Sequence, residues 1–272
     1  MDPAQKIAPQ TVYHICASDS RGILKNTLPI PSGLWYDNKR PFPAITHRSF
    51  TRYFEGRNLN LKKTILSYPK YSIVLIAAML CMNMIAYMGT RLFTTSRYHY
   101  NIESALDKML PVVPFFVVFY VLAFAQWIIC YLLIGREEKD VCMRIFIGEI
   151  IAKAMCLVIF LVFPTTLNRP ELTGGGIFER LLAFVYSLDA ADNLFPSIHC
   201  LESWMCWRGC RKLVNTRLPG WFNGANLIFT FFVFASTVLC KQHVLIDIAG
   251  GVAVVEIGLF LSGKILKKAG TQ

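Results

Sequence analysis

Residues 111–135 read PVVPFFVVFYVLAFAQWIICYLLIG, a stretch without a charged side chain. A helix needs about 20 consecutive apolar residues to cross the hydrocarbon core of a membrane, and this stretch is long enough. Further apolar blocks lie, approximately, at 71–90, 145–167, 194–210, 220–240 and 243–266. We therefore predict an all-α fold, a polytopic membrane bundle of about six transmembrane helices.

The composition of the chain agrees with a membrane protein. Hydrophobic residues make up 54% of the chain and the mean hydropathy is +0.45, whereas ordinary soluble domains are about 45–50% apolar. The net charge of +11 does not indicate a nucleic-acid partner. Lys and Arg lie mainly in segments that flank the apolar blocks, where they determine topology and contact anionic lipid headgroups.

The apolar blocks define three predicted regions. Residues 1–70 form a basic, proline-containing extension, residues 71–267 the six-helix transmembrane domain, and residues 268–272 a short tail. The first 20 residues lack the apolar core of a signal peptide, so we expect the first span to direct insertion. The block at 194–210 is the weakest, because it contains Glu202 and Arg208, but a span that lines a polar site tolerates such residues.

The distribution of positive charge predicts the orientation. With the N-terminus in the cytoplasm, the cytoplasmic segments carry 21 Lys and Arg and the outer segments carry 6. Cytoplasmic loops of membrane proteins carry the excess of Lys and Arg. We therefore expect both termini to be cytoplasmic.

The cysteines and a run of small residues indicate how the helices pack. The chain has nine cysteines, and no pair has the CxxC spacing of a zinc or redox site, so we expect small packing residues. The run of Ala249, Gly250, Gly251 and Ala253 predicts that the last helix approaches a neighbour closely.

Five polar residues fall at one level of the predicted topology, the outer end of the bundle. Arg169 follows the third apolar block, Ser197 and His199 begin the fourth, and His243 and Asp247 begin the sixth. Segments far apart in sequence therefore meet at the same depth, which predicts one site on the non-cytoplasmic face.

The spacing of these residues favours phosphate chemistry. His243 and Asp247 are four residues apart and share one face of a helix. The carboxylate can fix one imidazole nitrogen and leave the other as a nucleophile or base. Ser197 is suited to cap a helix whose free N–H groups attract an anion, and the guanidinium of Arg169 matches phosphate oxygens.

Three motifs resemble those of the type 2 phosphatidic acid phosphatase superfamily, which includes lipid phosphotransferases and vanadium haloperoxidases. They are VFPTTLNRP at 162–170, PSIH at 196–199 and STVLCKQHVLID at 236–247. The resemblance covers about residues 105–262 and leaves the N-terminal extension unexplained. PSxH followed by HxxxD, both at helix starts on one face, is the specific part of it.

The resemblance implies a role for each residue. His243 would attack phosphorus to give a phosphohistidine, with Asp247 orienting it. His199 would protonate the leaving group and then activate water or an acceptor hydroxyl. Arg169 and Ser197 would hold phosphate oxygens, and neither a metal nor a cofactor is implied.

Two positions depart from the motifs of this superfamily. The lysine of the first motif is replaced by Val162 and the arginine of the third by Thr237. Lys241 lies at the same level as His243 and is our candidate for a replacement phosphate-binding cation. A third motif without arginine also resembles that of the inositol phosphorylceramide and sphingomyelin synthases, which transfer a phosphoryl headgroup to a lipid alcohol.

Other polar residues receive simpler interpretations. Glu149 and Lys153 are spaced to neutralise each other within a span. Glu202, three residues after His199, can orient that histidine or serve the packing of its own helix. Asp189 and Asp192 precede PSIH in an outer segment, 168–193, that we expect to be a solvated loop, and the alternative is that they position substrate.

These observations predict a metal-independent membrane phosphatase acting on a lipid phosphate or diphosphate. The alternatives are a lipid phosphotransferase and a non-catalytic lipid-binding protein with a degenerate site. The expected partners are a lipid phosphate and membrane lipids, with no nucleic acid. The expected location is the cell membrane, with the site facing the non-cytoplasmic side.

Overall fold

The computed structural model of the chain describes residues 68–213, 216 and 218–270. Contacts divide the chain into two units, Met1–Asn58 and Leu59–Gln272, and all described residues belong to the second. Nearly all of the predicted N-terminal extension, and the end of the predicted tail, therefore lie outside the described residues.

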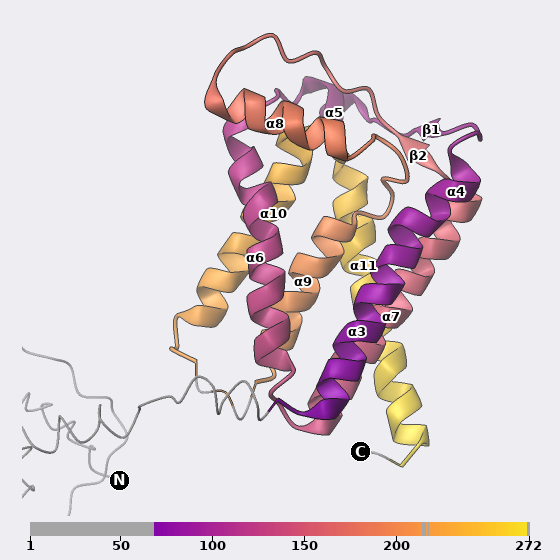
Figure 1. Cartoon of the computed structure of the whole chain (residues 1–272), viewed down its shortest axis with the longest axis vertical. Coiled ribbons are helices and arrows are strands. Elements are labelled where there is room, and N and C mark those ends of the chain that lie inside the picture. Colours follow the sequence, from indigo (N-terminus) through magenta and orange to yellow (C-terminus); the bar gives the residue numbers. More distant parts are fainter. Residues whose placement is uncertain (1–67, 214–215, 217, 271–272) are drawn as a thin grey trace, which may run out of the picture. The chain divides into compact units, whose positions relative to one another are not determined.

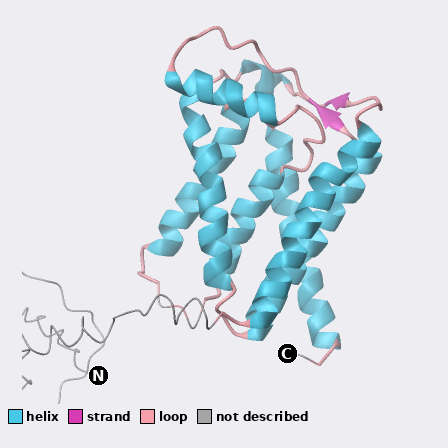
Figure 2. Ribbon diagram, viewed as in Figure 1, coloured by secondary structure: helices cyan, strands magenta, loops and turns pink. Residues whose placement is uncertain are grey.

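The described residues are mainly helical (Figures 1 and 2). The two short strands, β1 and β2, pair in parallel, with Tyr100 opposite Thr165. In chain order the elements are α3 (Lys70–Met84), the π-helix η1 (Ile85–Gly89), α4 (Thr90–Thr94), β1 (Tyr100–Asn101), α5 (Ala105–Met109), the 3-10 helix η2 (Pro114–Phe116), α6 (Val117–Ile134), α7 (Lys139–Val162), β2 (Thr165–Thr166), α8 (Ile177–Leu188), α9 (Ile198–Cys210), α10 (Phe222–Leu239) and α11 (Leu245–Lys268).

The predicted all-α membrane bundle is confirmed. Among the described residues, five helical segments are long and apolar enough to cross a membrane: Lys70–Thr94, Pro114–Ile134, Lys139–Val162, Phe222–Leu239 and Leu245–Lys268. They correspond to five of the six apolar blocks, and the largest difference is at α7, which both begins and ends about five residues earlier than predicted.

The fourth apolar block forms α9, which is shorter than a full span. It has 13 residues, about 20 Å of helix, against a hydrocarbon core of about 30 Å. The helix packs against α6, α7, α10 and α11, so its polar residues meet other helices. The polar character of this block is thus explained by its central position.

The helices alternate in direction, so α9 and α11 begin at the same end of the bundle. We call it the loop end, because α5, α8 and the β1–β2 pair lie there (Figure 1). The backbone N–H of Leu245, at the start of α11, donates to Asp107 Oδ1 of α5 over 2.8 Å. At the opposite end, Ser262 Oγ of α11 donates to the carbonyl of Arg144 near the start of α7 over 2.8 Å.

Residues 168–193, which we expected to form a loop, contain the helix α8. The Glu179 carboxylate accepts the N–H of Gly176 over 3.1 Å, which caps the first turn. Leu182 and Val185 are buried against Val117 and Tyr120 of α6, whereas Ile177 is exposed. An amphipathic helix therefore covers the loop end of the bundle.

The predicted close approach of α11 is present at its two glycines. A Cβ atom added at Gly251 would lie 2.7 Å from the carbonyl oxygen of Ser197, and one added at Gly250 would lie 2.6 Å from the Phe195 ring. The absence of side chains thus lets the start of α11 rest against the start of α9, which brings their polar residues together.

An ionic cluster occupies the middle of the bundle. Lys153 Nζ lies 2.8 Å from Glu149 Oε1 and 2.7 Å from Glu202 Oε1, and all three side chains are buried. The Tyr131 hydroxyl contacts both carboxylates. The predicted pairing of Glu149 with Lys153 is confirmed. A role for Glu202 in orienting His199 is wrong, because Lys153 and Tyr131 hold its carboxylate.

Candidate active site

The turn between α10 and α11 places His243. Lys241 has a positive φ of 50°, and the backbone N–H groups of Gln242 and His243 both donate to the carbonyl of Thr237 over 2.9 Å. The chain thereby reverses within a few residues, and His243 lies just before the first turn of α11.

His243 and Asp247 are in contact, as their spacing predicts. His243 Nδ1 lies 3.1 Å from Asp247 Oδ2, and the same oxygen accepts the N–H of Val244 over 3.0 Å. Asp247 is fully buried. With Nδ1 engaged as a donor to the carboxylate, Nε2 of His243 is the free nitrogen.

His199 faces His243 from the first turn of α9. The two ring centroids are 6.4 Å apart, which leaves space for a group between them. The His199 ring stacks on Tyr120 with centroids 4.0 Å apart, and Trp127 packs against it edge-on at 5.0 Å. These aromatic contacts fix the plane of the imidazole.

Ser197 is an N-cap residue rather than part of the cavity wall. Its Oγ accepts the N–H of Cys200 over 3.3 Å, and its own N–H donates to the Asp247 carbonyl over 3.1 Å. The side chain is completely buried. The structure therefore supports the predicted cap and does not bring the Ser197 hydroxyl to the space between the histidines.

Arg169 reaches the edge of the site with its guanidinium already engaged. Nε donates to the Lys241 carbonyl over 3.3 Å, and the two terminal nitrogens contact the Asp189 carbonyl and the Gln242 side chain. The guanidinium also lies 4.5 Å from the centre of the Tyr186 ring. Arg169 thus contacts the cavity residue Gln242 without lining the cavity itself, and it stabilises the turn between α10 and α11.

The Lys241 ammonium is bound outside the cavity lining. Its Nζ donates to the backbone carbonyl of Asp107 over 2.5 Å, and Lys241 does not line the cavity. The two positions where the motifs of the superfamily have a cation do not supply a charge either. Val162 is 71% exposed, and Thr237 is buried within the bundle. Within the described part of the chain, no lysine or arginine lines the cavity in front of His199 and His243.

A cavity of about 430 Å³ opens in front of the two histidines. Its lining is mainly apolar and includes the polar residues His199, Gln242 and His243. The lining residues are Asn83, Tyr87, Tyr120, Val121, Phe124, Trp127, Leu181, Phe184, Val185, Leu188, Asp189, Asp192, Asn193, Leu194, Ile198, His199, Gln242 and His243. This set of described residues contains no lysine or arginine.

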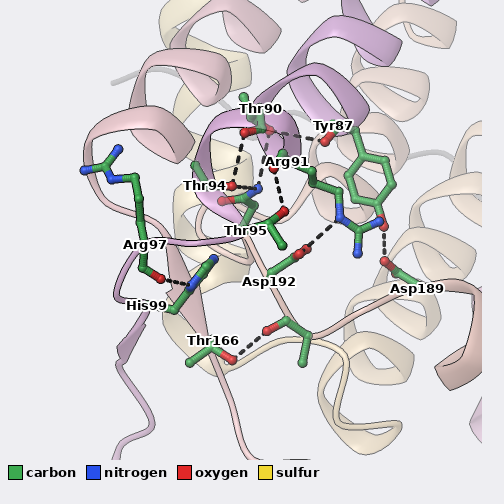
Figure 3. A network of polar contacts seen from close by, with 12 residues as sticks. Tyr87, Thr90, Arg91, Thr94, Thr95, Arg97, His99, Thr166, Asp189 and Asp192 are labelled. Carbon is green, nitrogen blue, oxygen red and sulfur yellow. Dashed lines mark hydrogen bonds and ion pairs between the residues drawn. The ribbon is translucent and has the colours of Figure 1, made fainter.

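Two aspartates of the segment after α8 form the polar rim of this cavity. Asp189 is contacted by the hydroxyls of Tyr87 and Tyr120, the latter at 3.2 Å, and Asp192 pairs with Arg91 Nε at 3.1 Å. Figure 3 shows that Tyr87 and Arg91 project from neighbouring turns toward these two carboxylates. The solvated-loop interpretation of Asp189 and Asp192 is therefore wrong.

Burial changes the acidity of one rim carboxyl. Desolvation raises the pKa of Asp189 from 3.8 to about 6; the charge of His243 opposes this shift and that of Asp192 adds to it. Asp189 therefore titrates close to neutral pH and is electrostatically linked to the histidine proposed as nucleophile.

Several buried polar atoms of the lining have no hydrogen-bond partner. Two are nitrogens, His199 Nε2 and Gln242 Nε2, and three are oxygens, on Asn83, Asp192 and Asn193. Leaving such atoms unpaired is costly unless a ligand or water satisfies them. The cavity is consequently suited to a polar group with both hydrogen-bond acceptors and donors.

Metal-binding geometry is not present among the described residues. In residues 68–213, 216 and 218–270, no group of three His, Cys, Asp or Glu side chains is arranged to hold an ion. The eight described cysteines are free thiols, and seven of them are buried, which agrees with their expected packing role.

The chain was compared with protein-family models and with curated proteins. No protein-family model matches the chain, and no curated protein is significantly similar to it. The resemblance to lipid phosphatases accordingly rests on the motif residues and on the geometry described above.

Proposed function

We propose that the chain is a membrane enzyme that removes phosphate from a lipid phosphate or diphosphate through a phosphohistidine at His243. The observation that carries the proposal is the facing pair of histidines, with centroids 6.4 Å apart, in which Asp247 holds His243 at 3.1 Å. An oriented imidazole opposite a second imidazole is the arrangement that nucleophilic catalysis with a separate proton donor requires.

In the first step, Nε2 of His243 attacks phosphorus as the bond between phosphorus and the leaving oxygen breaks. Burial and the charge of His243 lower the pKa of His199, so this step requires that the negative charge of the bound phosphate favours protonation of His199, which then gives the proton to the leaving alcohol or phosphate. Asp247 accepts the hydrogen bond of Nδ1–H and stabilises the positive charge that develops on the ring. The products of this step are the leaving group and a phosphohistidine.

In the second step, water replaces the leaving group. His199, now neutral, takes a proton from the water. At the same time the water oxygen bonds to phosphorus, and the bond between phosphorus and His243 Nε2 breaks. Inorganic phosphate leaves, and both histidines return to their initial states. The proton that His199 lost in the first step is thereby restored.

Phosphate oxygens need donors, and the Gln242 amide of the cavity lining is a candidate. Its Nε2 is buried without a hydrogen-bond partner, while its Oε1 accepts a hydrogen bond from Arg169. In this proposal the Gln242 amide donates to a phosphoryl oxygen, and Arg169 supports that amide from behind. The arrangement gives Gln242 a positioning and binding role that the motifs do not suggest.

The apolar part of the cavity supports a lipid substrate. Phe124, Phe184 and Leu188 line it and also have exposed faces of 49%, 58% and 67%. A hydrocarbon chain can therefore pass from the cavity to the surface of the bundle without crossing a polar barrier. With both termini in the cytoplasm, the site opens on the non-cytoplasmic side of the cell membrane.

Transfer to a lipid alcohol is the second candidate function. Asn83, Asp192 and Asn193 line the cavity, and each has a buried side-chain oxygen without a partner. These acceptors would suit the hydroxyl groups of an acceptor lipid, whereas hydrolysis needs only water. Both functions share the phosphohistidine and differ in what His199 activates.

The test is turnover by the full chain purified in detergent. Lipid phosphates and diphosphates are offered with and without a lipid alcohol, and free phosphate and new lipid products are followed. Phosphate release that is lost in His243→Ala supports the phosphatase, and product formed only with the alcohol supports the transferase. No turnover of any lipid phosphate or diphosphate would leave only the non-catalytic lipid-binding alternative.

A further inference from the structure

A second cavity lies at the end of the bundle opposite the histidines. It has a volume of about 300 Å³ and is formed by the start of α7, the end of α9 and the second half of α11. Its lining consists of Asp140, Val141, Arg144, Ile145, Arg208, Lys212 and Leu259. Three of these seven described residues are cations and one is an acid.

Two of the cations are unneutralised. Within the described part of the chain, neither the Arg144 guanidinium nor the Lys212 ammonium forms an ion pair, and both residues are exposed. The Arg144 guanidinium lies over Gly263 of α11, where an added Cβ would be 3.5 Å from one of its nitrogens. Such a distance is an ordinary van der Waals contact, so the Arg144 guanidinium lies against α11 at this position.

The third cation is held in place by an acid outside the lining. Arg208 Nε and Nη2 lie 2.7 and 2.9 Å from the two carboxylate oxygens of Glu256, and Trp204 donates to the same carboxylate over 2.8 Å. This ion pair, with a hydrogen bond from Nη2, holds the Arg208 guanidinium at the cavity wall. It leaves the Nη1 edge of the guanidinium for a ligand.

The position of this cavity separates it from the histidine site. Leu259 follows His243 by 16 residues along α11, a rise of about 24 Å. The two cavities have no lining residue in common. A ligand of the second cavity is therefore not the group on which the histidines act.

We propose that this second cavity binds the phosphate-bearing headgroup of an anionic membrane lipid. Arg144, Arg208 and Lys212 offer donors to the phosphate oxygens. Val141, Ile145 and Leu259 supply an apolar wall beside these cations. A free phosphate ion would use the cations and leave that wall without a function.

The surroundings favour a lipid over a soluble anion. The cavity lies between α7 and α11, which are both long and apolar enough to cross a membrane. On α11, Ile257, Phe260 and Ile265 expose 46%, 59% and 51% of their surface next to the cavity residue Leu259, so acyl chains can lie along that helix. Basic pockets between membrane helices on the cytoplasmic side are suited to anionic headgroups.

The experiment compares lipid binding by the full chain in detergent. Native mass spectrometry is used with phosphatidylglycerol and phosphatidylcholine of identical acyl chains, and inorganic phosphate is added in a third arm. We expect a preference of about 10-fold or more for phosphatidylglycerol in the wild type, since each cation near a headgroup contributes about 1 kcal/mol.

The variants assign the preference to the cavity. Arg144→Gln with Lys212→Gln should remove most of the preference, whereas Lys267→Gln with Lys268→Gln, at the same end of α11 but outside the lining, should keep it. If the first double variant does not fold, Lys212→Gln alone should still reduce the preference several-fold. Equal binding of the two lipids, an equal loss in the control, or competition by inorganic phosphate as strong as that by lipid would overturn the proposal.

Discussion

The carboxylate of Asp247 contacts the imidazole of His243 and the backbone of the helix at once. Its Oδ2 lies 3.1 Å from His243 Nδ1 and accepts the N–H of Val244 over 3.0 Å, while its Oδ1 is buried without a partner. One side chain therefore caps α11 and orients the histidine that faces the cavity. A substitution at Asp247 affects both functions unless the cap is controlled for.

Asp247→Asn should lower phosphate release by about 100-fold or more, because an amide stabilises the imidazolium less than a carboxylate and can present the wrong group to Nδ1. Asp107→Asn is the matched control. Asp107 accepts the N–H of Leu245 at the same helix start over 2.8 Å but does not line the cavity. Steady-state assays with thermal unfolding curves separate the roles, and equal activity losses in both variants would show that Asp247 acts only through the cap.

Asp189 predicts a pH dependence of stability. Its folded-state pKa of about 6 exceeds the ordinary value of 3.8, so the folded protein binds more protons than the unfolded chain between these values. Stability contributed through this group is therefore present at low pH and lost as pH rises through about 4 to 6. Relative to wild type, Asp189→Asn should become more stable by roughly 1–2 kcal/mol across that range, after discounting for partial exposure.

The opposite trend is expected for Asp107. Burial alone would raise the pKa of Asp107, but hydrogen bonds from Ser104 and from the Leu245 N–H outweigh it, so the pKa is lowered. The stability that wild type gains over Asp107→Asn should therefore increase as pH rises. The Asp107 difference changes below about pH 4, where the unfolded carboxyl takes up its proton, so thermal unfolding in detergent from about pH 2 to pH 8 measures both differences. Parallel pH curves for wild type and Asp189→Asn would contradict the raised pKa of Asp189.

Much of the fold follows from local sequence, and α8 shows the limit. A span is recognisable because about 20 adjacent residues must all be apolar, which is why five blocks match the helices. In α8 the buried residues Leu182 and Val185 lie three apart, and the helix also carries the charged residues Glu179 and Arg180. A search for long unbroken apolar blocks does not find such a short amphipathic helix.

The candidate site divides in the same way. His243 and Asp247 are four residues apart in sequence, so helix geometry alone predicts their contact. Lys241 is bound to the carbonyl of Asp107, 134 residues away, and no local pattern foretells that partner. Asp189 likewise meets Tyr87 across 102 residues, so its burial depends on how α8 folds over the bundle.

Gly251 should be intolerant of even one methyl group. A Cβ there would lie 2.7 Å from the Ser197 carbonyl oxygen and 3.1 Å from the Leu201 nitrogen, both backbone atoms that cannot rotate away. Gly251→Ala should therefore cost about 1–3 kcal/mol and, by moving α11 from α9, should lower phosphate release as well. Gly224→Ala in α10 is the control, because nothing lies within 4 Å of its added Cβ and alanine favours a helix by about 1 kcal/mol. Thermal unfolding that is unchanged in Gly251→Ala would contradict the close approach.

Lys153→Met tests what holds the centre of the bundle together. The ammonium is the cation that Glu149 and Glu202 share, at 2.8 and 2.7 Å, so its removal leaves two buried carboxylates facing each other. We expect a loss of about 3–5 kcal/mol, the usual cost of breaking a buried pair. Lys264→Met, which removes an ammonium lying 4.4 Å from the Phe260 ring on the surface of α11, should cost less than about 1 kcal/mol.

A triple variant separates charge from packing at the same place. Lys153→Met combined with Glu149→Gln and Glu202→Gln removes every charge from the cluster and nearly preserves the side-chain volumes. If uncompensated charge causes the loss, the triple variant should recover most of the stability of the wild type, because uncharged groups of similar size often replace a buried ion pair at little cost. Thermal unfolding in detergent compares the three proteins. A triple variant as unstable as Lys153→Met would mean that the hydrogen bonds around Tyr131, rather than the charges, hold α6, α7 and α9 together.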